Sequence, residues 1–326
     1  MMTWFDAHSD IWDDVTNRRA AGETDVLRRF HLDRLKEGGV EGSIFVMWVD
    51  SLQEKDHSGK FRQILAAVKD ELAETTAVVP VRSYSEMMAA RDTGKFYVFL
   101  GLEGLCGIGE NVDMIDELHA FGCRHASLTW NEENALATGA LGDPGRGLTA
   151  LGREAVRKLE KNRMIVDVSH ANDKTFWDIM DATSAPLMAS HSNSRALCNA
   201  ARNLTDDQLR AIRDRGGVVG LNAYQFFISE QAEHQTAEQL TRHLAHMIDV
   251  CGIDCVGCGF DFIDFLPGTT NDQFYQDGFP IGTKGLENCT KLPHFHRCLQ
   301  DMGLSDVEIR KIAYGNFHDL IRRVVG

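Results

Sequence analysis

Three histidines and three acidic residues follow short apolar runs in this sequence of 326 residues. These residues are His8, Asp10, Glu103, His170, His191 and Asp261. Their imidazole nitrogens and carboxylate oxygens are ligands that suit zinc or a similar divalent ion. Six such groups are too many for one tetrahedral ion and are enough for two ions that share a bridging carboxylate. Two ions about 3.5–4 Å apart can hold a hydroxide between them and polarise a substrate carbonyl.

The stretch from residue 164 to residue 203 shows how the chain places two of these ligands. Residues 164–168 and 186–190 are apolar runs without polar alternation, which is typical of parallel strands buried on both faces. The residues between them predict a helix over 171–182, with Asn172 or Asp173 able to cap its start. His170 and His191 therefore follow consecutive strands at the carboxyl ends, where ligands and metals collect in α/β folds.

Eight candidate strands alternate with helices along the whole chain. The strands are residues 2–8, 41–49, 95–102, 124–130, 164–168, 186–190, 218–223 and 255–260. The main helices are residues 61–76, 112–121, 149–161, 171–182, 204–215, 236–250, 287–302 and 305–314. We predict an α/β protein, a single (β/α)8 TIM barrel over residues 1–326 with the metal site at its C-terminal face. An open doubly wound sheet is the alternative architecture, but no G-x-G-x-x-G motif follows the first strand to favour it.

Composition and charge bear on partners and location. The formal net charge of −14, without a long basic run, argues against nucleic acid and anionic membrane as partners. No apolar run approaches the ~20 residues of a membrane span, and the first residues lack the basic and apolar regions of a secretory signal. The eight cysteines are scattered, as expected for buried reduced thiols, so we predict a cytoplasmic protein.

Seven short motifs resemble the membrane (renal) dipeptidase family of dizinc peptidases. They are DAHSDIW at 6–12, GLEG at 101–104, LTWN at 128–131, DVSH at 167–170, SHSN at 190–193, ARNLTDD at 201–207 and GFDF at 259–262. They occur in the family's order and span nearly the whole predicted barrel. The resemblance implies an enzyme that cleaves dipeptides and tolerates a D-residue at the C-terminal position. It also implies two zinc ions per chain, although cobalt or manganese would suit the same ligands, and it is compatible with a homodimer.

The resemblance also implies a role for each matching residue. His8 and Asp10 would hold one zinc ion, His170 and His191 the other, and Glu103 would bridge them. Asp261 would handle protons for the attacking water. Arg202 would pair with the substrate carboxylate, and Tyr224, in the sequence GLNAY, would form part of the pocket wall.

One residue departs from the family pattern. Many members have a histidine after Leu-Thr, which contacts the substrate at the scissile group, and this chain has Trp130 there. His125 lies an odd number of positions away in the same predicted strand, so we expect it to point to the other face. Asn131 is the neighbouring residue that can donate a hydrogen bond.

This departure keeps two alternatives open. One is a related metal-dependent hydrolase of another amide, a β-lactam or a lactone, because pocket loops rather than the fold decide the substrate. The other is a non-catalytic relative that binds a ligand, which the intact ligand set and Asp261 argue against. Arg202 favours a substrate with a free carboxylate, whether the enzyme is a dipeptidase or another hydrolase.

Overall fold

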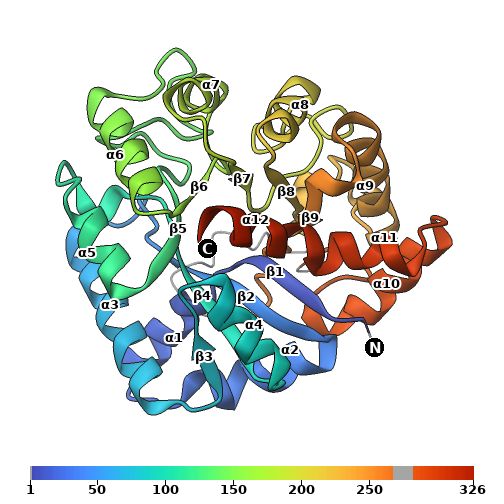
Figure 1. Cartoon of the computed structure of the whole chain (residues 1–326), viewed down its shortest axis with the longest axis horizontal. Coiled ribbons are helices and arrows are strands. Elements are labelled where there is room, and N and C mark those ends of the chain that lie inside the picture. Colours follow the sequence, from blue (N-terminus) through green and yellow to red (C-terminus); the bar gives the residue numbers. More distant parts are fainter. Residues whose placement is uncertain (1, 267–281) are drawn as a thin grey trace.

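The computed structural model of the chain describes residues 2–266 and 282–326. Eight parallel strands form a barrel in the order β1-β2-β4-β5-β6-β7-β8-β9 (Figure 1). Their bounds are β1 (Trp4–Ser9), β2 (Val40–Trp48), β4 (Phe96–Glu103), β5 (Cys123–Ser127), β6 (Ile165–Asp167), β7 (Met188–Ala189), β8 (Val218–Leu221) and β9 (Val256–Cys258). Helices surround the strands, so the predicted (β/α)8 barrel is confirmed.

Several of the helices begin at a side-chain cap. After β1 come α1 (Ile11–Ala20) and α2 (Leu32–Gly38), followed in turn by α3 (His57–Glu74), α4 (Tyr84–Asp92), α5 (Met114–Phe121), α6 (Ala150–Lys161), α7 (Asp173–Ala182), α8 (Asp206–Asp214), α9 (Ala237–Cys251), α10 (Leu292–Asp301), α11 (Asp306–Arg310) and α12 (Asn316–Val324). Asn172 caps α7 by accepting a hydrogen bond from Thr175 N at 2.7 Å, as its position predicted. Thr205 and Gln208 form a capping box at the start of α8. Within the described ranges, no helix has the length and apolar character needed to span a membrane.

Two strands differ from the prediction. A short strand that was not predicted, β3 (Val78–Pro80), pairs with the first residues of β4. The pairing of β5 with β4 begins only at Leu100, so β3 covers the edge that the start of β4 would otherwise expose. The predicted strand over 124–130 ends at Ser127, which places Trp130 in the loop that follows.

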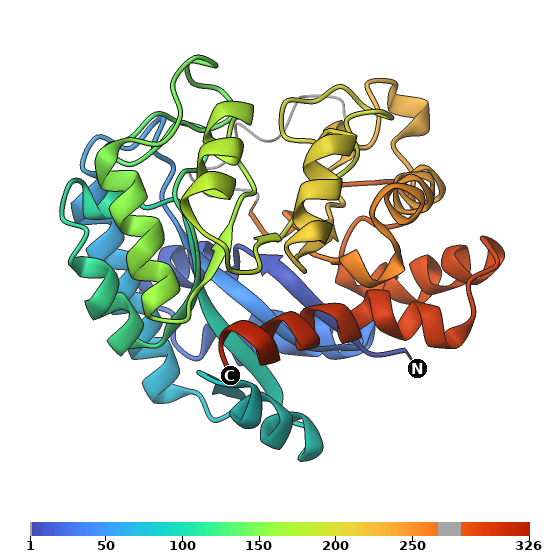
Figure 2. The same cartoon turned by 45° about the horizontal axis from the view of Figure 1, so that its top comes forward.

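The barrel interior is filled by apolar side chains and is closed at its amino-terminal end by α12, which the sequence did not predict. Figure 1 shows α12 lying across the centre of the barrel, and Figure 2 shows it passing below the strands. Phe317 and Ile321 of α12 pack with the interior residues Phe5 and Tyr97. Gly257 of β9 permits this contact, because a Cβ there would lie 2.4 Å from the Phe317 ring.

The two strands that complete the barrel meet through a side chain. Asp6 of β1 accepts a hydrogen bond from Phe260 N, just beyond β9, at 2.8 Å. Because α12 closes the amino-terminal end of the barrel, the opposite end is the open mouth.

Candidate metal and substrate site

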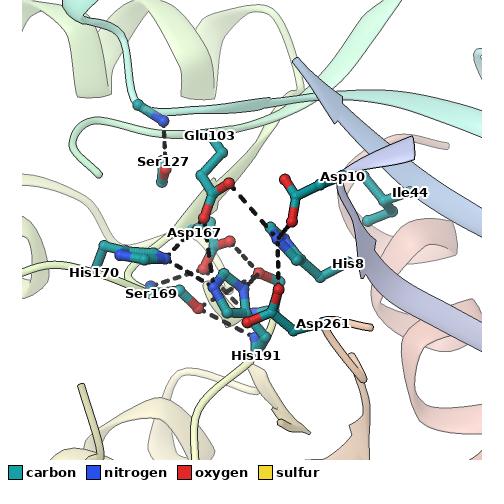
Figure 3. Close-up of polar contacts among 12 residues, drawn as sticks. His8, Asp10, Ile44, Glu103, Ser127, Asp167, Ser169, His170, His191 and Asp261 are labelled. Atoms are coloured by element: carbon teal, nitrogen blue, oxygen red, sulfur yellow. Dashed lines mark hydrogen bonds and ion pairs between the residues drawn. The ribbon is translucent and has the colours of Figure 1, made fainter. Parts of the chain in front are cut away.

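All six candidate ligands meet at the carboxyl ends of the strands (Figure 3). His8 lies within β1, and Glu103 is the last residue of β4. Three further candidate residues, His170, His191 and Asp261, lie just beyond β6, β7 and β9. The spacing of His8 and Asp10 would place both side chains on one face of a continuous strand, but β1 ends at Ser9 and Asp10 is the N-cap residue of α1.

Two of these residues have an unusual backbone. His170 and Asp261 are in the left-handed region, with φ of 68° and 57°. Such a conformation costs a residue with a Cβ on the order of 1–3 kcal/mol and persists where the surroundings enforce it, often at functional sites. In both loops the side chain points to the centre of the mouth (Figure 3).

His8 stands among three carboxylates. Its Nε2 lies 3.6 Å from Asp10 Oδ2, 3.7 Å from Glu103 Oε2 and 3.8 Å from Asp261 Oδ1. Burial alone would lower the pKa of His8, but these negative charges outweigh it and raise the pKa to about 10. Within the described ranges, neither ring nitrogen of His8 nor Oδ1 of Asp10 has a hydrogen-bond partner, although all three atoms are buried. Buried polar atoms left in this state suit a bound cation.

His170 and His191 form a second group beside Glu103, and the ring centroid of His191 lies 3.7 Å from that of His8. His170 Nε2 lies 2.7 Å from Glu103 Oε1 and 2.9 Å from His191 Nε2. The opposite nitrogens are already engaged, His170 Nδ1 with Asn131 Oδ1 at 2.9 Å and His191 Nδ1 with Ser190 Oγ at 2.7 Å. If each Nδ1 carries the ring proton, two Nε2 lone pairs face each other beside a carboxylate. A cation between them resolves that repulsion.

Burial and positive charge disfavour protonation of the second group. Burial, together with Arg202 and His8, lowers the pKa of both His170 and His191 well below the usual value. Burial raises the pKa of Glu103 well above its usual value, although His8 opposes this effect. Neutral imidazoles are the form in which histidine binds a metal. The second group therefore fits a divalent ion. In the first group, the three carboxylates that raise the pKa of His8 would attract a cation in place of the ring proton, and Glu103 presents one oxygen to each group.

One carboxylate oxygen of Asp261 accepts a hydrogen bond, and the other faces the candidate ligand His8. Asn222, just after β8, donates to Asp261 Oδ2 at 2.9 Å, and Oδ1 faces His8. Burial raises the pKa of Asp261, as does the negative charge of Asp10, while His8 opposes both. A carboxylate positioned in this way can exchange a proton with a neighbouring group.

A cavity opens beside these residues, with about 490 Å³ of empty space that includes open solvent. Its lining combines polar side chains with aromatic and aliphatic ones. It is lined by Asp10, Trp48, Glu103, Trp130, Asn131, His170, Tyr224, Phe227, Asp261, Ile263 and Leu266. The rings of Trp48 and Trp130 meet edge to face, with centroids 5.1 Å apart.

Arg202 is buried behind the cavity wall. Its guanidinium carbon lies 5.5 Å from the ring centroid of Phe227, and its Nη2 donates to His191 O at 3.3 Å. Burial lowers its pKa to about 10, although the negative Glu103 and Asp261 oppose this change. Its Nε is buried without a hydrogen-bond partner among the residues described. A buried cation with an unused donor suits an anionic ligand.

Four residues that contact this site had no role predicted from the sequence. Trp48 ends β2 at the mouth, and its place at a strand end is the same signal that located the ligands. Asp167 and Ser190 lie inside the DVSH and SHSN motifs, but their contacts depend on strand pairing. Asn222 follows β8.

Comparisons with known proteins agree with this geometry. The family model for membrane dipeptidase (peptidase family M19) matches residues 1–325. An uncharacterized dipeptidase of Schizosaccharomyces pombe is 36% identical over 210 residues, which are 63% of this chain and 47% of that relative, so the match spans about half of the relative's length. A second uncharacterized dipeptidase of the same yeast is 32% identical over 323 residues, covering 93% of this chain and 73% of the relative.

A solved structure extends the comparison to three dimensions. The metallopeptidase from Rhodobacter sphaeroides liganded with a phosphinate mimic of the dipeptide L-Ala-D-Ala has a TM-score of 0.85 and 27% identity, with 99% of each chain covered. The likeness therefore extends over the barrel and the loops that carry the site. This chain belongs to the membrane dipeptidase family, peptidase family M19, whose members are metal-dependent peptide hydrolases.

Proposed function

We propose that the protein is a dizinc dipeptidase that tolerates a D-residue at the C-terminal position of its substrate. The observation that carries this proposal is the placement of Glu103 between two groups of metal-binding residues, with Oε1 2.7 Å from His170 and Oε2 3.7 Å from His8. Family membership supports the peptidase activity. The L-Ala-D-Ala mimic bound by the similar Rhodobacter sphaeroides metallopeptidase supports the stereochemistry.

Different residues of the chain would bind the metal ions and transfer the proton. His8 and Asp10 would hold one zinc ion, His170 and His191 the other, and Glu103 both. When bound, two such ions polarise a carbonyl and make a water molecule acidic enough to attack it.

Asp261 Oδ1 would accept a proton from the attacking water and return it to the leaving amine, as a base and afterwards as an acid. Asn222 holds the other oxygen of Asp261 in place.

The substrate would be oriented by the buried cation and the aromatic wall. Arg202 pairs with the free carboxylate of the dipeptide, and Tyr224 and Trp130 shape the space for its side chains. Asn131 lines the same cavity and holds the ring of His170 through its Oδ1. A cytoplasmic location and a homodimer stay predictions. The eight cysteines, all unpaired and buried, support the first of these.

The test combines metal analysis with a substrate panel. Purified protein loaded with zinc is assayed against L,L-, L,D- and D,D-dipeptides and one β-lactam, alongside the Asp261→Asn variant. We expect two equivalents of zinc in both proteins, hydrolysis of L,L- and L,D-dipeptides by the wild type, and a fall in kcat of about 10²–10⁴ in the variant.

Other results would redirect the assignment. Hydrolysis of the β-lactam alone would assign a different amide substrate, and two zinc ions without any hydrolysis would indicate a binding relative. Zinc loss from Asp261→Asn would make Asp261 a metal ligand.

A further inference from the structure

A chain of buried hydrogen bonds runs beneath the second group of ligands. His125 Nε2 lies 2.8 Å from Asp167 Oδ2, Ser190 Oγ lies 2.5 Å from the same oxygen, and Ser190 Oγ lies 2.7 Å from His191 Nδ1. All four residues are at most 2% exposed. Figure 3 shows Asp167 between Glu103 and His191, below the mouth of the barrel.

The carboxylate of Asp167 uses its full capacity as an acceptor. Oδ1 accepts from Ser169 N at 2.8 Å and from Ser190 N at 3.0 Å, while Oδ2 accepts from Ser190 Oγ and His125 Nε2. Burial would raise the pKa of Asp167, but the bonds from His125, Ser190 and Ser169 N together hold it below the usual value. Asp167 is therefore an anion that only accepts hydrogen bonds.

This arrangement fixes the direction of the bond to His191. A serine hydroxyl has one hydrogen, and Ser190 gives it to Asp167. Ser190 Oγ can then only accept from its other neighbours, which are Ser169 Oγ at 3.4 Å and His191 Nδ1 at 2.7 Å, so His191 must carry its proton on Nδ1. The Nε2 lone pair of His191 is left free and points toward Glu103 and His170, whose nearest atoms lie 3.6 Å and 2.9 Å away.

We propose that Asp167 and Ser190 are positioning residues that lock His191 in the tautomer able to bind a metal through Nε2. This inference rests on the proposed metal site. It separates the two histidines of that site by the partners of their Nδ1 atoms. Nδ1 of His170 lies against the neutral amide of Asn131, whereas Nδ1 of His191 lies against Ser190, which is bonded to a buried anion. Groups that orient a ligand histidine in this way raise its affinity for the metal.

The proposal predicts an unequal effect of two small substitutions. Ser190→Ala removes the bridge and leaves His191 free to choose either tautomer. Asp167→Asn places an NH₂ group opposite Ser190, so the hydroxyl must turn and donate to His191 Nδ1. His191 is then forced to carry its proton on Nε2, which cannot bind zinc. We therefore expect Asp167→Asn to weaken zinc binding more than Ser190→Ala does, although it changes fewer atoms.

Zinc affinity of the full chain, measured by competition with a chromophoric chelator, tests this order. We expect about a 10- to 100-fold loss for Ser190→Ala and a larger loss for Asp167→Asn. Ser192→Ala is the matched control, because Ser192 also adjoins His191, is 1% exposed, and has a hydroxyl without a hydrogen-bond partner among the described residues. Its affinity should stay within about threefold of the wild type.

The ¹⁵N spectrum of labelled histidines in the metal-free proteins adds a direct readout of the tautomer. We expect a signal of the Nδ1–H form in the wild type to become one of the Nε2–H form in Asp167→Asn. An unchanged tautomer, wild-type zinc affinity in Asp167→Asn, or an equal loss in Ser190→Ala and Ser192→Ala would overturn the proposal. If Asp167→Asn does not fold by circular dichroism, the comparison of Ser190→Ala with Ser192→Ala still decides. A wild type that binds no zinc would instead refute the proposed function.

Discussion

Replacing Arg202 tests whether the substrate must carry a free carboxylate. Arg202 is 7% exposed, and its Nε is buried without a hydrogen-bond partner among the described residues, so an incoming carboxylate would find a cation that water screens little. Hydrogen bonds to a charged group contribute about 1.5–3 kcal/mol, and losing one partner of a buried ion pair costs about 3–5 kcal/mol. A loss of about 2–4 kcal/mol corresponds to roughly a 30- to 1000-fold fall in kcat/KM.

The assay compares a dipeptide with its C-terminal amide. Wild type should strongly prefer the free acid. Arg202→Met, which keeps the length of the side chain without its charge, should lose most of that preference. Arg202→Lys keeps the charge but not the planar fork, and we expect an intermediate loss.

Zinc content is measured in each protein, because Arg202 also donates to His191 O and its removal can disturb that ligand. If Arg202→Met retains two zinc ions and the full preference for the free acid, Arg202 does not bind the substrate.

Three further predictions concern the bridge, the aromatic wall and a buried histidine. Glu103→Gln removes a negative charge shared by both groups of ligands, so metal content and activity should fall together; normal zinc content with normal turnover would refute the bridging role. Trp130→Phe removes part of the contact with Trp48 and should change the order of preferred dipeptides, while the best rate stays within about tenfold, or ~1.4 kcal/mol. A uniform loss across all dipeptides would instead place Trp130 in the catalytic machinery. Burial lowers the pKa of His243 to about 4, against the effect of its bond to Ile228 O, so the unfolded chain takes up a proton between pH 6.5 and 4 that the folded chain does not. In urea unfolding of the metal-free protein, the loss of stability over that range should be smaller in His243→Gln than in the wild type by up to about 3 kcal/mol, and an equally steep fall in both proteins would refute the assignment.

The sequence predicted the parts of this molecule that depend on local pattern. Buried parallel strands are continuous apolar runs, and a histidine directly after such a run must lie at the mouth, so the positions of His170 and His191 followed from the chain alone. The helix cap at Asn172 was likewise predicted from the local sequence.

The parts that escaped prediction depend on contacts between distant segments. The short strand β3 exists because β5 begins late along β4, and the sequence near Val78 does not contain that information. Helix α12 was missed because its apolar residues match the interior of a barrel made by the rest of the chain. Similarly, the sequence shows Asp167 only as an acidic residue at the end of a strand. Its contact with Ser190 depends on the pairing of β6 with β7.

The hydrogen bond from Phe260 N to Asp6 has a consequence for the lifetime of the closed barrel. It joins the two strands that complete the ring, and His8 and Asp261 lie directly beyond it along the chain. Ions held by His8 would bind the closed ring and not the opened one, and a ligand at about 100 times its Kd adds about 2.7 kcal/mol to the closed state. Amide hydrogens along this seam should therefore exchange slowly when zinc is bound and become the first in the barrel to exchange after chelation.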